Sequence, residues 1–361
     1  MQIMRRRLFV LAATAFLTVA TLTVSPGRAE QPSKTFEQVA DCIENARANS
    51  YWDYYDGVLD ESDTTIYRSE GKTERDWLTQ RRVVFGDMDG GFARTMLSAL
   101  RARMIALPEA AVADLCDLAL VEAQSARRAA GRTLRSYQAD PAVAAQQAQL
   151  LRSAQFWKVP RGSVVWLGDI MFDRLTNNLR AMDSLIRRLK AHGAVFIMGN
   201  HEEYYRPQGC KRGSWGCFAT GRANYSTEEF DDLLATAFVR AHYDSRNRLL
   251  HTHNGVKASG DVLHTAFGDL SDFRSRTPQE IVRWMGQQPI DYGRFTSFRP
   301  SDAAMEFTTI LDGQNRIRQA HGHNACFTFE YQWVFPLNAR VGFHCHRLAA
   351  AAVTFSPTAS P

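Results

Sequence analysis

Short apolar runs alternate with helical patterns in the middle of the chain. Three runs have the length and the β-branched content of buried strands, namely Arg82–Phe85, Ser163–Leu167 and Ala194–Met198. Helical periodicity covers Phe92–Ile105 after the first run and Leu179–Ala191 before the third. Strands that alternate with helices are typical of the α/β class. We therefore expect an α/β fold.

Each predicted strand is followed by a glycine and a polar residue. The pairs are Gly86-Asp87, Gly168-Asp169 and Gly199-Asn200. In α/β sheets, ligands collect at the carboxyl ends of the strands. We therefore expect these polar side chains to face one common site.

Two longer stretches interrupt this pattern. Residues 108–157 are rich in Ala, Gln, Arg and Leu with helical periodicity, which predicts a helical insertion. Residues 204–249 contain two cysteines and a predicted helix over Thr227–His242, and we interpret them as a cap of loops and a helix. The predicted organisation is one main domain over residues 30–355 that carries both insertions, followed by a tail at 356–361.

The first 29 residues have the pattern of a signal peptide. Arginines precede an apolar run of 17 residues, Leu8–Val24, and small residues with a proline follow in Ser25–Ala29. An uncleaved anchor is the alternative, although 17 residues are at the short limit for a membrane span. We expect cleavage after Ala29 and an exported protein, periplasmic or secreted, with no stable membrane span thereafter.

Composition and charge argue against a disordered protein and against a nucleic-acid-binding protein. Hydrophobic residues make up 45% and charged residues 22% of the chain, which excludes general disorder. The net charge is +5, but four of the 43 basic residues lie in the signal segment, which has no acidic residue. The remaining 39 basic residues nearly balance the 38 acidic ones, so no nucleic-acid partner is expected.

An even number of cysteines in an exported chain favours disulfides. The expected pairs are Cys210–Cys217 and Cys326–Cys345, which leaves Cys42 and Cys116 over. Six reduced thiols remain the alternative.

Polar motifs recur in order along the chain. They are Asp87-Met88-Asp89, Asp169 with Asp173-Arg174, Asn200-His201-Glu202, His253-Asn254-Gly255 and Gly322-His323-Asn324. Carboxylates, imidazoles and an amide are ligands that manganese, iron and zinc accept. The glycines beside them allow the sharp turns that let such side chains converge.

This set resembles the calcineurin-like metallophosphoesterase superfamily, nearest to its phosphoprotein (serine/threonine) phosphatase branch. That family's pattern is Gly-Asp-x-His-Gly, Gly-Asp-x-x-Asp-Arg, Gly-Asn-His-Glu, a lone His before a glycine, and a later Gly-His. Asp89 stands where the family usually has His, and one extra residue separates Asp169 from Asp173. The resemblance implies a four-layer αββα metallophosphoesterase sandwich and two divalent metal ions (Mn, Fe or Zn, with Mn favoured).

The resemblance also implies roles for individual residues. The implied metal ligands are Asp87, Asp89, Asp169 as the bridge, Asn200, His253 and His323. His201 would protonate the leaving oxygen and Asp173 would orient it, while Arg174 and Asn200 would bind the phosphoryl oxygens. His251 and His321 remain alternatives to His253 and His323, because each lies two residues away and would point the same way on a strand.

The function implied is hydrolysis of phosphomonoesters by a metal-bound hydroxide, with a phosphorylated protein as the substrate. Two alternatives stay open. One is a nucleotide or dinucleoside-polyphosphate hydrolase, which shares these motifs. The other is a degenerate, non-catalytic protein that binds metal or phosphate, suggested by Asp89 and by the extra residue before Asp173.

Overall fold

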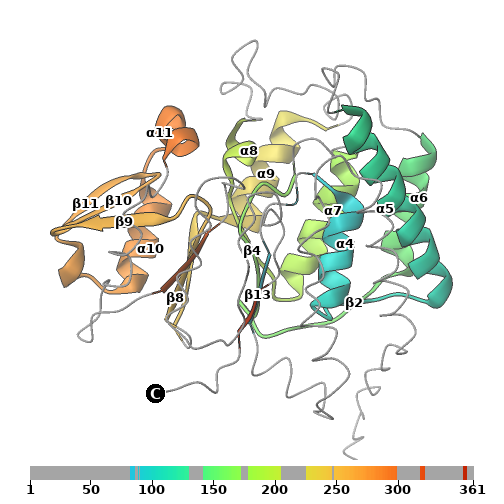
Figure 1. The fold of residues 1–361 in the computed structure, drawn as a ribbon, viewed down its shortest axis with the longest axis horizontal. Coiled ribbons are helices and arrows are strands. Elements are labelled where there is room, and N and C mark those ends of the chain that lie inside the picture. Colours follow the sequence, from blue (N-terminus) through green and yellow to red (C-terminus); the bar gives the residue numbers. More distant parts are fainter. Residues whose placement is uncertain are drawn as a thin grey trace, which may run out of the picture. The chain divides into compact units, whose positions relative to one another are not determined.

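The structure is a computed structural model. It describes residues 82–85, 88, 90–129, 141–171, 178–204, 225–245, 248–298, 318–321 and 353–355. All of them belong to one unit, Ser33–Pro361. Helices and several small sheets alternate within it (Figure 1), so the chain is of mixed α/β class. The predicted signal segment and the predicted tail lie outside the described residues.

The largest sheet contains the three strands that the sequence predicts. Its order is β13 (Val353–Phe355), β1 (Arg82–Phe85), β4 (Val164–Trp166), β5 (Val195–Ile197) and β6 (Phe238–Val239). Strands β1, β4, β5 and β6 are parallel, and β13 is antiparallel to β1. The carboxyl ends of β1, β4 and β5 therefore meet at one edge, as expected.

Aromatic side chains cross this sheet from strand to strand. Phe85, Trp166, Phe196 and Phe238 are paired in register. Their ring centroids are 5.1, 4.9 and 5.9 Å apart in that order. The indole N–H of Trp166 donates to Ser98 Oγ at 3.2 Å. This ladder of rings fills the core between the sheet and the helices. The bond to Ser98 satisfies the indole N–H of Trp166.

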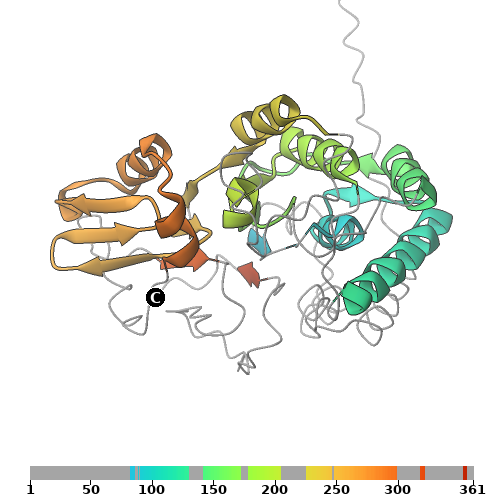
Figure 2. The same ribbon diagram turned by 90° about the horizontal axis from the view of Figure 1, so that it is seen from above.

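Helices from the first half of the chain pack together. They are α4 (Phe92–Arg101), α5 (Glu109–Ala129), α6 (Pro141–Ser153) and α7 (Leu179–Ala191). Figure 2 shows α5 and α6 side by side, and α6 also contacts α7. α7 has the predicted bounds, because Asn178 accepts the N–H of Ala181 as its N-cap. Two helices thus occupy the stretch predicted to be a helical insertion.

The first predicted helix is too long in the sequence analysis. α4 ends at Arg101, and Ile105–Ala106 forms strand β2, which pairs with β3 (Gln155–Phe156). Arg103 between them has a φ of 53°, so the chain turns there through the left-handed region. The helical periodicity of the sequence continues across this turn and therefore did not predict it.

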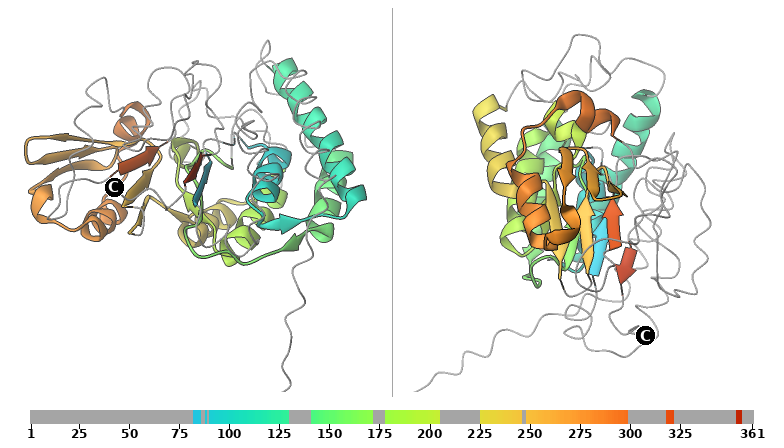
Figure 3. Two further views of the ribbon diagram at one scale, coloured as in Figure 1. Left: turned by 60° about the horizontal axis from the view of Figure 1, so that its bottom comes forward. Right: turned by 90° about the vertical axis from the view of Figure 1, so that its left-hand side faces the viewer.

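Two smaller sheets follow. One has the order β12 (Arg318–His321), β8 (Leu249–Thr252) and β7 (Ala241–Asp244). The other is an antiparallel meander of β9 (Val256–Ser259), β10 (Val262–Thr265) and β11 (Gly268–Ser271). The short helix η2 (Phe273–Ser275), α10 (Pro278–Gln287) and α11 (Tyr292–Ser297) come next in sequence, as Figure 3 shows.

The predicted helix over Thr227–His242 is also shorter in the structure. α9 (Thr227–Ala237) begins with a capping box of Ser226 and Glu229 and stops where β6 begins. Phe238 and Val239 pair with Phe196 and Ile197 of β5, so sheet pairing overrides the helical pattern. The last part of the predicted cap therefore belongs to the sheets, whereas residues 205–224 lie outside the described residues.

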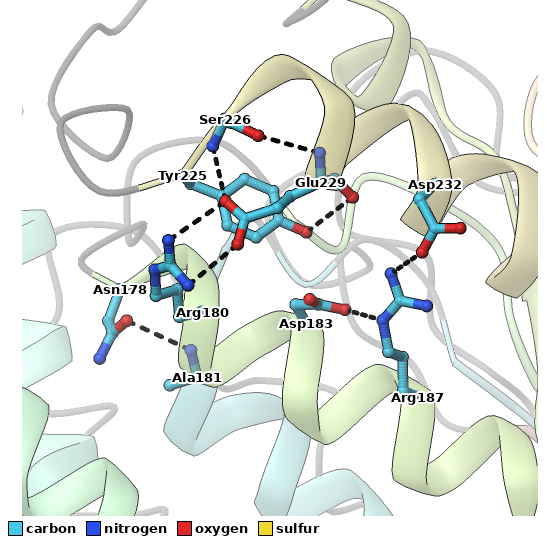
Figure 4. A network of polar contacts seen from close by, with 9 residues as sticks. All are labelled: Asn178, Arg180, Ala181, Asp183, Arg187, Tyr225, Ser226, Glu229 and Asp232. Atoms are coloured by element: carbon cyan, nitrogen blue, oxygen red, sulfur yellow. Dashed lines mark hydrogen bonds and ion pairs between the residues drawn. The ribbon is translucent and has the colours of Figure 1, made fainter.

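Polar contacts connect α7 to α9 and to Tyr225, which precedes α9 (Figure 4). Arg180 pairs with Glu229 at 2.9 Å, and Arg187 pairs with Asp183 and Asp232 at 2.5 and 2.7 Å. The hydroxyl of Tyr225 donates to the carbonyl of Glu229 at 3.4 Å. Burial, followed by the charge of Asp183, raises the pKa of Tyr225 well above its ordinary value.

Cys116 of α5 is disulfide-bonded. The other five cysteines lie outside the described residues. Over the described ranges, no helix has both the length and the apolar character that crossing a membrane requires.

Candidate functional site

Four of the predicted site residues come together where β4, β5 and β8 end. Asp169 follows β4, Asn200 and His201 begin α8 (Asn200–Tyr204), and His253 follows β8. Nε2 of His253 lies 2.8 Å from Asn200 Oδ1 and 3.4 Å from Asp169 Oδ1. Nε2 of His201 lies 3.8 Å from Asp169 Oδ2. Residues far apart in sequence thus form one compact polar cluster.

The remaining predicted site residues are Asp87, Asp89, Asp173, Arg174 and His323, and they lie outside the described residues. Within the described part of the chain, no group of three or more His, Cys, Asp or Glu side chains could hold a metal ion. Met88 of the first motif and Gly90 directly after it are nevertheless hydrogen-bonded to the loop after β4. The N–H groups of Met88 and Gly90 donate to the carbonyls of Asp169 and Ile170, both at 3.1 Å.

His253 is buried and its ring orientation is fixed. Its Nδ1 lies 2.8 Å from the carbonyl oxygen of Leu167. Because a carbonyl can only accept, Nδ1 carries a proton and the neutral ring has its lone pair on Nε2. That lone pair faces the side-chain oxygens of Asn200 and Asp169. Three electron-donating atoms therefore converge on a small volume, an arrangement that a cation or an additional proton on Nε2 would stabilise.

His251, the alternative to His253, has other surroundings. It is fully buried within β8, its Nδ1 lies 3.3 Å from the carbonyl oxygen of His242, and the two rings stack at 5.6 Å. His253 lies beyond the last residue of β8, in a turn that Gly255 closes at a φ of 76°. Strand alternation therefore does not place the two histidines on one face. β12 ends at His321, level with Thr252.

Two glycines allow the loops after β4 and β5 to touch. A Cβ on Gly168 would lie 2.5 Å from His253 Nδ1 and 2.7 Å from the Cα of Gly199. A Cβ on Gly199 would lie 2.1 Å from Asp169 Oδ1. Gly168 also has a φ of 115°, which L side chains rarely adopt. Only glycine fits at either position.

Asp169 is held at both its backbone and its side chain. Its φ of 51° is left-handed, and its Oδ1 accepts the N–H of His201 at 2.9 Å. This bond caps the N-terminus of α8. The carboxylate comes from a different loop and takes the place of an N-cap side chain. Gly199 precedes α8 and has no side chain to do so.

Glu202 is the main site residue to which the sequence analysis assigned no role. Its side chain is 0% exposed. One oxygen accepts the N–H groups of Ile170 and Met171 at 2.6 and 2.9 Å, and the other accepts those of Asp169 and Gly199 at 2.9 and 2.8 Å. Burial, then the negative charge of Asp169, raises the pKa of Glu202, while the N–H groups of Met171 and Gly199 act in the opposite direction. Its position in the Gly-Asn-His-Glu motif was the only sequence signal.

A second buried glutamate supports the start of α4. Glu122 of α5 accepts the N–H of Ala93 at 2.8 Å, and α4 begins directly after the first motif. The carboxylate lies at the positive end of the helix dipole, where negative charge is stabilised. Nothing in the sequence of the predicted insertion indicated this contact.

α11 lies beside the cluster. It contacts α8, and the carbonyl of Phe295 accepts from Asn254 Nδ2 at 2.7 Å. The rings of Phe295 and His253 are 6.5 Å apart. Asn254 thus joins α11 to the turn that carries His253.

Comparisons with known proteins give little further information. No family model matches the chain, and no curated protein matches it. Among solved structures, it is similar to the phosphatase domain from the Legionella effector WipB, at 15% sequence identity and a TM-score of 0.30. The similarity covers 48% of this chain and 68% of that one. A TM-score of 0.30 does not establish a shared fold, so the chemistry of the site rests on this chain's own residues.

Proposed function

We propose that this protein is an exported, metal-dependent phosphatase that hydrolyses phosphomonoesters, with phosphorylated proteins as the favoured substrates. The observation that carries the proposal is the convergence of Asp169, Asn200 and Nε2 of His253 at the carboxyl edge of the sheet. A phosphoryl group bound at this edge would meet the polar residues of several motifs at once.

The donor set fits a divalent cation of the intermediate kind. Carboxylate, amide oxygen and neutral imidazole suit manganese, iron or zinc, and the bond from His253 Nδ1 to Leu167 fixes the nitrogen that would bind. When bound, two such ions would supply a nucleophile near neutral pH and positive charge for the phosphoryl oxygens. Asp169 would bridge them, and Asp87, Asp89 and His323 would complete the ligand set within the expected four-layer sandwich.

His201 is suited to donate a proton. Its side chain is 20% exposed, so it can reach a leaving group, while its backbone N–H is anchored to Asp169. In this proposal the ring protonates the leaving oxygen, Asp173 orients it and Arg174 binds the phosphoryl oxygens. Arg is favoured there because its planar guanidinium matches phosphate geometry.

The test uses the chain without residues 1–29, stripped of metal and then supplied with Mn²⁺, Fe²⁺ or Zn²⁺. We expect turnover of p-nitrophenyl phosphate and of phosphopeptides that a chelator abolishes and added metal restores. Faster turnover of nucleotides than of phosphopeptides would favour the nucleotide hydrolase instead. Metal binding without turnover of any phosphate ester would show a non-catalytic binding protein and overturn the proposal.

A further inference from the structure

We propose that Glu202 is a positioning residue that sets the orientation of Asp169. The role given to Asp169 rests on the proposed function, whereas the contacts of Glu202 do not. Glu202 is fully buried, and each of its two carboxylate oxygens accepts two backbone N–H groups. A carboxylate has about four acceptor positions, so its hydrogen-bonding capacity is filled entirely by the two loops of the site.

The first part of this arrangement is an anion-binding nest. The consecutive N–H groups of Asp169, Ile170 and Met171 all point at the Glu202 carboxylate. Successive backbone N–H groups in a tight turn form a concavity that attracts negative charge. Asp169 has the left-handed φ of 51° within that turn. The buried carboxylate therefore stabilises the backbone conformation from which the Asp169 side chain projects.

The second part connects the two loops in both directions. Glu202 accepts the N–H of Asp169 at 2.9 Å, and one residue earlier the N–H of His201 donates to the Asp169 carboxylate at 2.9 Å. The first turn of α8 thus fixes Asp169 at its backbone and at its side chain. The bond from Gly199 N–H to Glu202, at 2.8 Å, ties the same carboxylate to the end of the loop after β5.

This geometry makes both acceptor oxygens of Glu202 matter, as well as its size. Glutamine is nearly isosteric, but its amide offers one acceptor oxygen and one donor group. In a Glu202→Gln protein, two of the four N–H groups would face an NH₂ group and lose their acceptor. The loops should then relax, and Asp169 should no longer be held next to Asn200 and His253.

The experiment compares Glu202→Gln with the wild type by two readouts. Native-state hydrogen exchange should become at least about tenfold faster at the N–H groups of Asp169, Ile170, Met171 and Gly199. The N–H of Leu167, which donates to Phe85, should be unchanged and serves as the internal reference. Titration calorimetry with Mn²⁺ alone should show affinity lower by roughly 10–100-fold, the usual loss when a partner that orients a ligand is removed.

Leu185→Ala is the matched control for a general loss of stability. Leu185 is buried in α7 and is not among the site residues. This variant should lower Tm and leave Mn²⁺ affinity unchanged. If Glu202→Gln does not fold, Glu202→Asp is measured in its place. It keeps the charge but is one methylene shorter, so it should lose affinity in the same direction and by less.

Each outcome decides one part of the proposal. Unchanged exchange at the four N–H groups would overturn the clamp itself. Faster exchange with wild-type Mn²⁺ affinity would overturn the positioning role and leave Glu202 with local structure only. A wild-type protein that binds no divalent metal would overturn the proposed function, and hydrogen exchange alone would then decide whether Glu202 holds the two loops.

Discussion

Two polar networks in this protein make similar numbers of contacts in different surroundings. In the site, the Glu202 carboxylate is 0% exposed and accepts four backbone N–H groups from two loops. Between α7 and α9, the side chain of Arg187 is 37% exposed, and it pairs with Asp183 and with Asp232, whose side chain is 60% exposed. Both networks join elements that are distant in sequence.

The difference between them is access to water. An exposed ion pair exchanges one set of hydrogen bonds for another and contributes about 0.2–1 kcal/mol. A buried N–H group that loses its acceptor costs about 1–3 kcal/mol, because no water replaces it. The number of contacts therefore does not rank the two networks, and substitutions in each should have effects of very different size.

The largest effect is expected at Asp169. Asp169→Ala removes the carboxylate that faces His253 and the group that accepts the N–H of His201. We expect metal content and turnover to be lost together, measured by elemental analysis and by hydrolysis of p-nitrophenyl phosphate. A variant that keeps its metal would show that Asp169 is not the bridging ligand.

His201→Ala should separate metal binding from turnover in the site. The backbone N–H of residue 201 still donates to Asp169, so metal content and fold should be retained. Turnover should fall by roughly 10²–10⁴-fold, the usual contribution of a positioned acid. The loss should be smaller for nitrophenyl phosphate, whose leaving group needs little protonation, than for a phosphoserine peptide. Equal losses on both substrates would contradict the acid role.

Gly199→Ala tests how tightly the buried network is packed. The new Cβ would lie 2.1 Å from Asp169 Oδ1, so that carboxylate must move. We expect a loss of about 1–3 kcal/mol in the free energy of unfolding, as for other overpacked sites, and weaker Mn²⁺ binding. Gly286→Ala is the control, because a Cβ in α10 meets nothing within 4 Å and should stabilise by about 0.5–1 kcal/mol.

The smallest effect is expected in the exposed network. Arg187→Ala should lower the free energy of unfolding by less than about 1 kcal/mol, and the difference from wild type should shrink at high salt. Turnover should not change. Urea unfolding at low and high ionic strength measures the effect. A loss of unfolding free energy as large as that of Gly199→Ala would show that exposure does not separate the two networks.

The sequence predicted the features that local residue patterns determine, and it failed where a distant segment determines the structure. The three strands and the polar residues after them are local signals, so Asp169 and Asn200 were placed at the sheet edge correctly. The choice of His253 over His251 depended on the glycine of the following turn, which the structure also contains. Elements whose end is set by pairing with a distant strand, such as α9, could not be delimited from periodicity.

The role of Glu202 was beyond sequence reasoning for a different reason. Three of its partners are backbone N–H groups 31 to 33 residues away. Almost every residue type has a backbone N–H group, so the sequence does not show which of them bind Glu202. Asp87, Asp89, Asp173, Arg174 and His323 remain predictions, because they lie outside the described residues.

A contact made through backbone groups also has a consequence for how this loop can diverge. Glu202 binds Ile170 and Met171 through their backbone N–H groups, so this contact does not depend on which side chains they carry. Both side chains are buried, so only the packing of the core restricts them. Any change of loop length between residues 169 and 171 would move an N–H group out of the nest, whereas a residue added after Met171 leaves all four bonds intact. An insertion between Asp169 and Met171 is therefore expected to disrupt the clamp, and an insertion after Met171 is not.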